Sequence, residues 1–210
     1  KGKLKVDCIY RRLDDTFLDP KVFYKESLIG VPGLFKCWKK GNVGIINALG
    51  TGVADDKAVY SYVNKMIVYY LGEQPKLNQV ETFLCENKVH RQHVIENIAK
   101  LVVKPANASG GYGIMIGPKA PKKERDEMVK KIKKNPRDFV AQPLEILSTI
   151  PTICENGIEP RHLDLRPFIL TGKTSYVTTG GLTRVALRKG STIVNSSQGG
   201  GSKDTMVVDA

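Results

Sequence analysis

Lys104 follows an apolar stretch at 101–103 and precedes a glycine-rich segment, SGGYG at 109–113. Glycines allow backbone N–H groups to approach phosphate oxygens closely, and a lysine ammonium neutralises phosphate charge. The spacing fits neither common nucleotide-binding motif. The chain contains no G-x-x-x-x-G-K-[ST] sequence. The glycine-rich stretch 111–117 is one residue longer than the dinucleotide-binding motif G-x-G-x-x-G. The segment therefore predicts either a phosphate-binding loop or an ordinary β-hairpin turn.

A carboxylate and a guanidinium occur two residues apart in DLRPF at 164–168. On a β-strand, Asp164, Arg166 and Phe168 would project from the same face, so the two charges could act together on a polar ligand. The alternative is a structural ion pair on a sheet surface, which contributes little to stability. Pro167 then predicts an open strand edge at this point.

The segment 180–204 places Arg184 on one predicted strand and Asn195 at the end of the next, shortly before three consecutive glycines at 199–201. Such a run is costly in conformational entropy unless the backbone must adopt an unusual conformation. A flexible linker is the alternative, but linkers rarely follow such strand-forming residues directly.

Helices and strands are mixed along the chain, and its second half is rich in predicted hairpins. This order predicts an α+β fold rather than a regularly alternating parallel sheet. The expected helices are 55–70, 89–99 and 121–134, with short helical turns within 24–38. The expected strands are 4–10, 43–49, 81–85, 101–104, 114–117, 139–142, 162–170, 174–179, 182–187 and 192–195.

The net charge of +12 raises the question of nucleic-acid binding. Much of it lies in the predicted helix at 121–134, where lysines alternate with acidic residues around an apolar stripe of Met128, Val129 and Ile132. The helix lacks interleaved aromatic residues, and no nucleic-acid-binding motif accompanies it. We expect a solvated basic face and no specific nucleic-acid partner.

Composition and cysteine spacing exclude several classes of protein. Apolar residues make up 41% of the chain, which excludes intrinsic disorder as the main state, and the apolar runs are too short to span a bilayer, so we expect no membrane partner. Cys8, Cys37, Cys85 and Cys154 form no C-x-x-C pair. We expect reduced thiols without a metal or disulfide, in a cytoplasmic protein.

Together these segments resemble a known family. YRRLDD at 10–15, GTGVADDKAVY at 50–60 and SGGYG, with DLRPF, GGLTRVAL and NSSQGGGSKDT, are similar to the circularly permuted ATP-grasp proteins of bacteria, and so to the synthetase domain of glutathionylspermidine synthase. The resemblance implies a glutathione-synthetase-like ATP-grasp fold in which two α+β subdomains hold ATP. Residues 81–143 would form the lid-type subdomain, and the remainder of 1–210 the core-type subdomain.

The resemblance also implies an activity and a set of site residues. The family implies ATP-dependent ligation of a carboxylate to an amine or peptide nitrogen through an acyl phosphate. In that reaction Arg166 and Arg184 would be catalytic, because they would stabilise phosphoryl oxygens. The implied nucleotide-binding residues are Lys57, Lys104, Gly110, Gly111, Gly113, Gln142, Leu144, Glu145, Asp164, Asn195, Gly199 and Gly200.

Within that set, the family implies different roles for different residues. The two lysines would bind the nucleotide, and the glycines of SGGYG would form the lid loop over the phosphates. Gln142 and Leu144 would belong to the hinge that holds adenine, and Glu145 would contact the ribose. The segment YRRLDD belongs to the matching motif, so its charged residues are either site residues or part of an exposed polar link.

The resemblance implies Mg²⁺ as a second cofactor, held by a carboxylate followed by Glu-x-Asn. No acidic residue of this sequence begins such a motif, so its metal ligands stay unknown. In the family this stretch lies upstream of the matching segment, and we therefore expect the C-terminal portion of a longer protein. The alternative is a degenerate, non-catalytic module that binds a nucleotide or a partner. Helical companion and transglutaminase-like proteins are the partners that the resemblance implies.

Overall fold

The computed structural model describes residues 2, 4–108, 111–195 and 199–208. The elements combine short helices with antiparallel sheets, and the predicted α+β class is confirmed. The helices are α1 (Asp15–Leu18), α2 (Leu34–Lys39), η1 (Thr51–Asp55), α3 (Lys57–Tyr60), α4 (Val63–Leu71), α5 (Lys88–Glu96), α6 (Lys122–Lys134) and η2 (Pro136–Asp138). The strands are β1 (Cys8–Tyr10), β2 (Gly44–Ile46), β3 (Phe83–Leu84), β4 (Leu101–Pro105), β5 (Met115–Ile116), β6 (Phe139–Pro143), β7 (Thr149–Cys154), β8 (Gly157–Thr171), β9 (Ser175–Ala186) and β10 (Gly200–Asp204).

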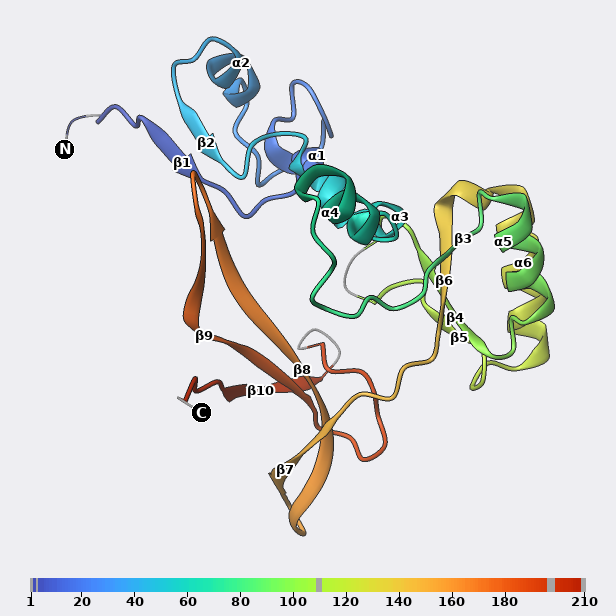
Figure 1. Ribbon diagram of the computed structural model, residues 1–210. Coiled ribbons are helices and arrows are strands. Elements are labelled where there is room, and N and C mark those ends of the chain that lie inside the picture. Colours follow the sequence, from blue (N-terminus) through green and yellow to red (C-terminus); the bar gives the residue numbers. More distant parts are fainter. Residues whose placement is uncertain (1, 3, 109–110, 196–198, 209–210) are drawn as a thin grey trace.

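The middle of the chain, residues 83–143, contains a four-stranded antiparallel sheet with the order β3-β6-β4-β5. Helices α5 and α6 lie together on one side of this sheet (Figure 1). They bury Val94, Met128 and Ile132 against Val103 and Met115 of the strands, in the larger hydrophobic core of the molecule. Helix α6 therefore has the amphipathic character that its sequence predicts, with its lysines on the outside.

Side-chain alternation divides the sheet into a core face and an open face. Leu101 and Val103 of β4 belong to the core under the helices, so Val102 and Lys104 project from the opposite side. The same rule places Ala141 in the core and Gln142 on the open face. The position of Lys104 is thus a consequence of the apolar residues that precede it.

A second four-stranded sheet has the order β10-β9-β8-β7. Its longest part is the antiparallel β8–β9 hairpin, which extends well beyond its neighbours in Figure 1. Strand β7 pairs with β8 only as far as His162, so β8 has an open edge at Pro167, as predicted. A register shift follows between Pro167 and Ile169, where the hairpin becomes a two-stranded ribbon.

The N-terminal part has its own small core around the parallel pair β1–β2. Asp19 is fully buried there and organises the turn before α2. Its carboxylate accepts hydrogen bonds from the backbone N–H groups of Lys21, Gly33 and Phe35, at 2.9–3.0 Å. Burial alone would raise the pKa of Asp19, but these three donors hold it below its usual value.

Several sequence-based boundaries were wrong. The helix predicted over 55–70 is divided into two shorter helices, α3 and α4, although it ends as expected at Gly72, which has a φ of 65°. Residues 192–195 form no strand, 174–179 and 182–187 belong to one strand, and the strands β7 and β10 were not predicted. No helix of the described chain is both long and apolar enough to span a bilayer.

Candidate functional site

A cavity of about 880 Å³ lies where the open face of the first sheet meets the second sheet and the segment before β10. Val102, Lys104 and Gln142 come from the first sheet, and Arg166 and Arg184 come from β8 and β9. A volume of this size is in the range of small-molecule and cofactor sites. Side chains far apart in the sequence therefore share one concave surface.

Most of the predicted site residues gather in this cavity. Eight line it, from both sheets, the connection after β6 and the segment before β10: Lys104, Gly111, Gln142, Leu144, Glu145, Arg166, Arg184 and Asn195. Five do not line it: Lys57, Gly113, Asp164, Gly199 and Gly200. Gly110 lies outside the described residues.

The apolar lining of the cavity was not predicted from the sequence. It is supplied by Val80, Val102, Ile114, Ile116, Leu144, Leu147, Ile193 and Val194, and of these only Leu144 was a candidate. The signal that could have found Val102 and Ile116 is alternation, since each is one residue away from a core position. The cavity therefore combines apolar walls with a small number of charged groups.

Lys104 is held by the neighbouring strand. Its Nζ donates a hydrogen bond of 2.5 Å to Oε1 of Gln142, and Val102 and Gln142 are directly paired across β4 and β6. Burial lowers the pKa of Lys104 below its ordinary value, and the nearby charge of Lys57 lowers it further. An ammonium that has lost water and sits near a second cation is prepared to bind an anion.

Lys57 approaches the same region from α3. Its backbone N–H donates to Ala106, and its Nζ donates to the carbonyl of Ala108, 2.6 Å away, immediately before the glycine-rich segment. Asp56 caps α3 and forms an ion pair of 2.6 Å with Arg137, which links this helix to η2, directly before β6. Burial lowers the pKa of Lys57, and the carboxylates of Asp56 and Asp55 offset part of that effect.

The two arginines of the site differ in their environment. Arg184 lies directly opposite Asp164, whose two carboxylate oxygens accept from Nε, at 2.9 Å, and from Nη2. These hydrogen bonds raise the pKa of Arg184 and fix its guanidinium. Arg166 has no ion-pair or hydrogen-bond partner among the described residues, so its charge is available to a ligand. The ion pair predicted for this strand thus joins Asp164 to Arg184 rather than to Arg166.

Two of the predicted glycines support the cavity wall from behind. A Cβ at Gly200 would lie 2.3 Å from the carbonyl oxygen of Val194, and the Gly200 N–H donates to Asn195. Gly199 has a φ of 82°, which favours glycine. These residues hold the segment with Val194 and Asn195 close to β10, so the linker alternative for the glycine run is wrong for Gly199 and Gly200.

Residues 11–15 of the segment YRRLDD line a separate cavity of about 430 Å³ together with Asn47 and part of η1. Arg11 is only 8% exposed, donates to the carbonyls of Leu13, Asn47 and Ala48, and forms an ion pair of 2.5 Å with Asp15. The charge of Arg11 is therefore used inside the fold, so this residue does not belong to an exposed polar link.

The larger cavity has few possible metal ligands among the described residues, whereas the smaller one is lined by Asp14, Asp15 and Asp55. Among the described residues, no group of three or more His, Cys, Asp or Glu side chains could hold a metal ion. In the larger cavity, Glu145 is the acidic residue of the lining, and Asp164 behind it is engaged by Arg184. The donor set of this part of the chain thus fits an anionic ligand and does not fit a magnesium ion.

Comparison with known proteins shows which family the sequence matches and over which residues. The model of the family described as circularly permuted ATP-grasp type 2 matches residues 1–186. The Synechocystis sp. protein sll0335 is 55% identical over 209 residues, which are 99% of this chain and 44% of that protein. The Mycobacterium tuberculosis protein Rv2411c is 51% identical over 209 residues, which are 99% of this chain and 38% of that protein.

A third relative has a name that refers to an activity. A Frankia casuarinae protein, provisionally named glutamate–cysteine ligase 2-2, is 45% identical over 205 residues, which are 98% of this chain and 24% of that protein. The chain spans less than half the length of each of these relatives. The name of the Frankia protein therefore describes a molecule of which the matched region is about a quarter.

Proposed function

This chain belongs to the circularly permuted ATP-grasp type 2 family, and on that premise we propose that its cavity binds ATP for the ligation of a carboxylate to an amine. The observation that carries the proposal is the meeting of Lys104, Arg166 and Arg184 with an apolar wall in one cavity. A nucleotide has the same division, with an apolar base at one end and a charged triphosphate at the other.

The base would lie against the apolar wall and the connection after β6. Gln142, Leu144 and Glu145 line the cavity one after another, so backbone N–H and C=O groups of this segment are close enough to form the hinge that reads adenine. The carboxylate of Glu145 would then contact the ribose hydroxyls. Val102, Ile116 and Val194 would exclude water from the faces of the base.

The triphosphate would lie among the cations. Two opposite charges about 4 Å apart interact by roughly 1 kcal/mol in water and about 4 kcal/mol in a partly shielded site. Lys104 is half-buried, which favours the larger value. Arg166 forms no ion pair with any described residue, whereas Arg184 keeps a fixed orientation because Asp164 holds it. These groups are suited to stabilise the charge that develops on phosphoryl oxygens during transfer.

The proposed reaction has two steps. An oxygen of the substrate carboxylate attacks the γ-phosphorus of ATP, the bond to the β-phosphate oxygen breaks, and ADP leaves an acyl phosphate behind. The amine nitrogen then attacks the carbonyl carbon, phosphate leaves, and the nitrogen loses a proton. Lys104, Arg166 and Arg184 contribute by binding and orienting the phosphates and by stabilising their charge.

The family normally uses ATP together with Mg²⁺. The described residues of this chain include no group of three or more His, Cys, Asp or Glu side chains that could hold that ion. The proposal includes two further expectations. Residues 81–143 would act as the lid-type subdomain, and the protein would interact with helical companion and transglutaminase-like proteins. A relationship to glutathionylspermidine synthase in particular is supported by the motifs alone.

The reaction can be tested by trapping its intermediate. The protein is incubated with ATP, Mg²⁺, hydroxylamine and a carboxylate, beginning with L-glutamate because the name of the Frankia relative suggests it. An acyl phosphate would give a hydroxamate and one equivalent of ADP, and the yield would fall in Arg166→Ala. Measurable ATP binding without hydroxamate or ADP over a panel of carboxylates would favour the non-catalytic module instead.

A further inference from the structure

A chain of hydrogen bonds leads from Lys104 away from the cavity and into the first sheet. Nζ of Lys104 donates to Oε1 of Gln142, and Nε2 of Gln142 donates to Oγ1 of Thr82, 2.8 Å away. The hydroxyl of Thr82 in turn donates to the carbonyl of Val80, at 3.0 Å. Thr82 does not line the cavity, and the resemblance to the family gives it no role.

The direction of every bond in this chain is determined. Lysine has donors only, so the amide of Gln142 must turn its oxygen to Lys104 and its nitrogen to Thr82. Because the Thr82 proton goes to Val80, the oxygen of Thr82 presents a lone pair to that nitrogen. The hydroxyl therefore selects the one amide orientation that can hold the ammonium.

The far end of the chain is fixed by the helix that carries the other lysine. The N–H of Val80 donates to the phenolic oxygen of Tyr60, at 3.1 Å, and Gln79 donates to the backbone carbonyl of Tyr60. Tyr60 ends α3, which begins at Lys57. The polar chain thus runs from Lys104 through Thr82 and Val80 to the helix that begins at Lys57.

We infer that Thr82 is a positioning residue that sets the place of the Lys104 ammonium in the cavity by orienting the amide of Gln142. The inference rests on the proposed function, because it takes the ligand of Lys104 to be a phosphate of ATP. Loss of the hydroxyl leaves the amide free to rotate, and the ammonium then loses its fixed acceptor. The effect should be confined to ligands that carry phosphates.

The test compares ATP with adenosine by calorimetry. Thr82→Val removes the hydroxyl and keeps the shape of the side chain, Thr82→Ser keeps the hydroxyl, and Thr82→Ala is a second variant without it. A single net hydrogen bond corresponds to about a 3- to 10-fold change in affinity. We expect a loss of this size for ATP in Thr82→Val and Thr82→Ala, an unchanged affinity for adenosine, and near-native ATP binding in Thr82→Ser.

A double-mutant cycle separates positioning from general damage to the fold. In a Lys104→Met background, Thr82→Val should cause no further loss of ATP affinity, because the group that it positions is absent. An equal loss for adenosine, or the full additional loss in the Lys104→Met background, would overturn the inference while the proposed ATP site stands. A native protein that binds neither ligand would instead overturn the proposed function, and the inference with it.

Discussion

Asp164 and Arg184 lie directly opposite each other on β8 and β9, and the guanidinium contacts both carboxylate oxygens. The two side chains are 28% and 17% exposed, so the pair is neither fully buried nor freely solvated. One arginine of the cavity is therefore fixed by the sheet itself, while Arg166, two residues along β8 from Asp164, has no ion-pair partner in the part of the chain that the structure describes.

Asp164→Asn should destabilise the fold and disturb ATP binding together. The remaining amide cannot accept two charge-assisted hydrogen bonds, and Arg184 stays partly buried without its counter-charge. We expect a loss of about 1–2 kcal/mol in the free energy of unfolding, measured in urea, which is less than for a fully buried pair. Asp204→Asn, an exposed change on β10 of the same sheet, is the control and should stay within about 0.5 kcal/mol. Equal effects of the two changes would mean that the pair adds nothing to the fold.

Gly200→Ala should displace one wall of the cavity. The added Cβ would lie 2.3 Å from the backbone oxygen of Val194, so the segment that contains Val194 and Asn195 must move away. We expect a loss of about 1–3 kcal/mol in the free energy of unfolding and weaker ATP binding. Gly52→Ala is the matched control, because nothing lies within 4 Å of its added Cβ and its φ is not in the left-handed region. A Gly200→Ala variant with native stability and native ATP affinity would contradict the close approach.

The pH dependence of ATP binding should report the environment of Lys104. In the free protein, burial and Lys57 lower the pKa of Lys104 below 10.5, so its ammonium loses its proton at a lower pH than an ordinary lysine does. Once the ATP phosphates are fully ionised, ATP affinity should be constant and then begin to fall, as the pH rises, before 10.5 is reached. Lys104→Arg should flatten this profile, because arginine stays charged throughout. A native profile that matches that of Lys104→Arg would assign the titration to another group.

The cysteines should differ in reactivity by their burial. Cys8 and Cys37 are exposed, whereas Cys85 is fully buried and its burial raises its pKa to about 11. A thiol reagent at pH 8 should modify Cys8 and Cys37 quickly in the native protein and leave Cys85 unmodified. In the denatured, unreduced protein all four cysteines should react, which mass spectrometry can count. Fewer than four free thiols would reveal a disulfide.

The residues that gather in the cavity could be predicted because each is carried by a local motif. Lys104 follows an apolar strand, Arg184 lies on a strand-forming stretch, and Asn195 precedes a glycine run that only a close backbone approach explains. The apolar stretch before Lys104 also determines, by alternation, that the lysine faces away from the core.

The ion-pair partner of Asp164, the place of β10 and the contact of Thr82 could not be predicted, because they depend on pairing between distant segments, which a single sequence does not specify. The partner of Asp164 is the residue opposite on β9, and nothing in DLRPF distinguishes Arg184 from Arg166 as that partner. Residues 192–195 have strand-forming side chains, yet β10 is the strand that pairs with β9. Gly200 and Gly201 of β10 leave room there for Val194 and Val185, which an added Cβ would contact closely. Thr82 carries no motif at all, and only the spatial meeting of β6 with residue 82 brings it behind Gln142.

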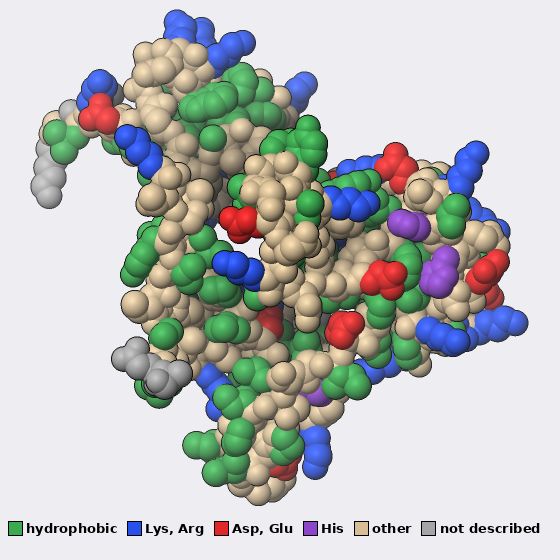
Figure 2. Space-filling model, in the orientation of Figure 1, with side chains coloured by type: hydrophobic (Ala, Val, Ile, Leu, Met, Phe, Trp, Pro, Cys, Tyr) green, Lys and Arg blue, Asp and Glu red, His purple; other side chains and the backbone are tan. Residues whose placement is uncertain are grey.

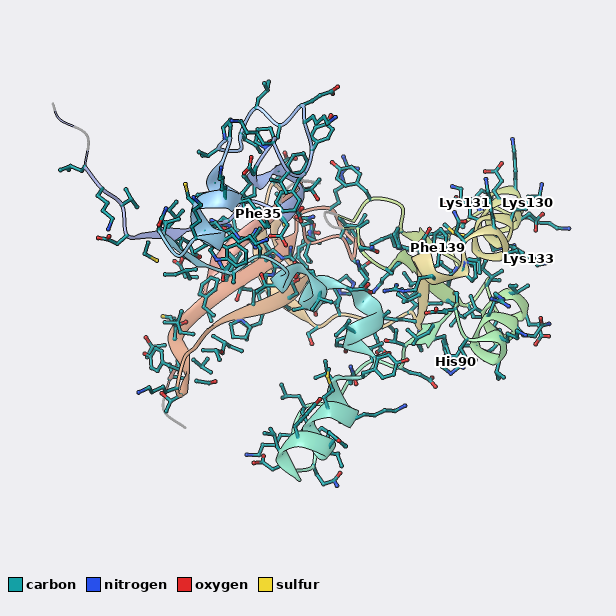
Figure 3. The ribbon with its side chains drawn as sticks, turned by 90° about the horizontal axis from the view of Figure 1, so that it is seen from above. Phe35, His90, Lys130, Lys131, Lys133 and Phe139 are labelled. Atoms are coloured by element: carbon teal, nitrogen blue, oxygen red, sulfur yellow. The ribbon has the colours of Figure 1, made fainter. Side chains whose placement is uncertain are left out.

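The central claim is that the cavity beside Lys104 is the ATP site, and the most direct test compares two lysines. Lys104 is half-buried in the cavity lining, whereas Lys133 is exposed on α6, at the outer end of the molecule where positive and negative side chains are interspersed (Figures 2 and 3). ATP affinity is measured by calorimetry in the presence of Mg²⁺ for the native protein, Lys104→Ala and Lys133→Ala. We expect Lys104→Ala to weaken binding by about 5-fold to several-hundred-fold, and Lys133→Ala to leave it unchanged. Equal, small effects of both changes in a folded protein would contradict the assignment of this cavity.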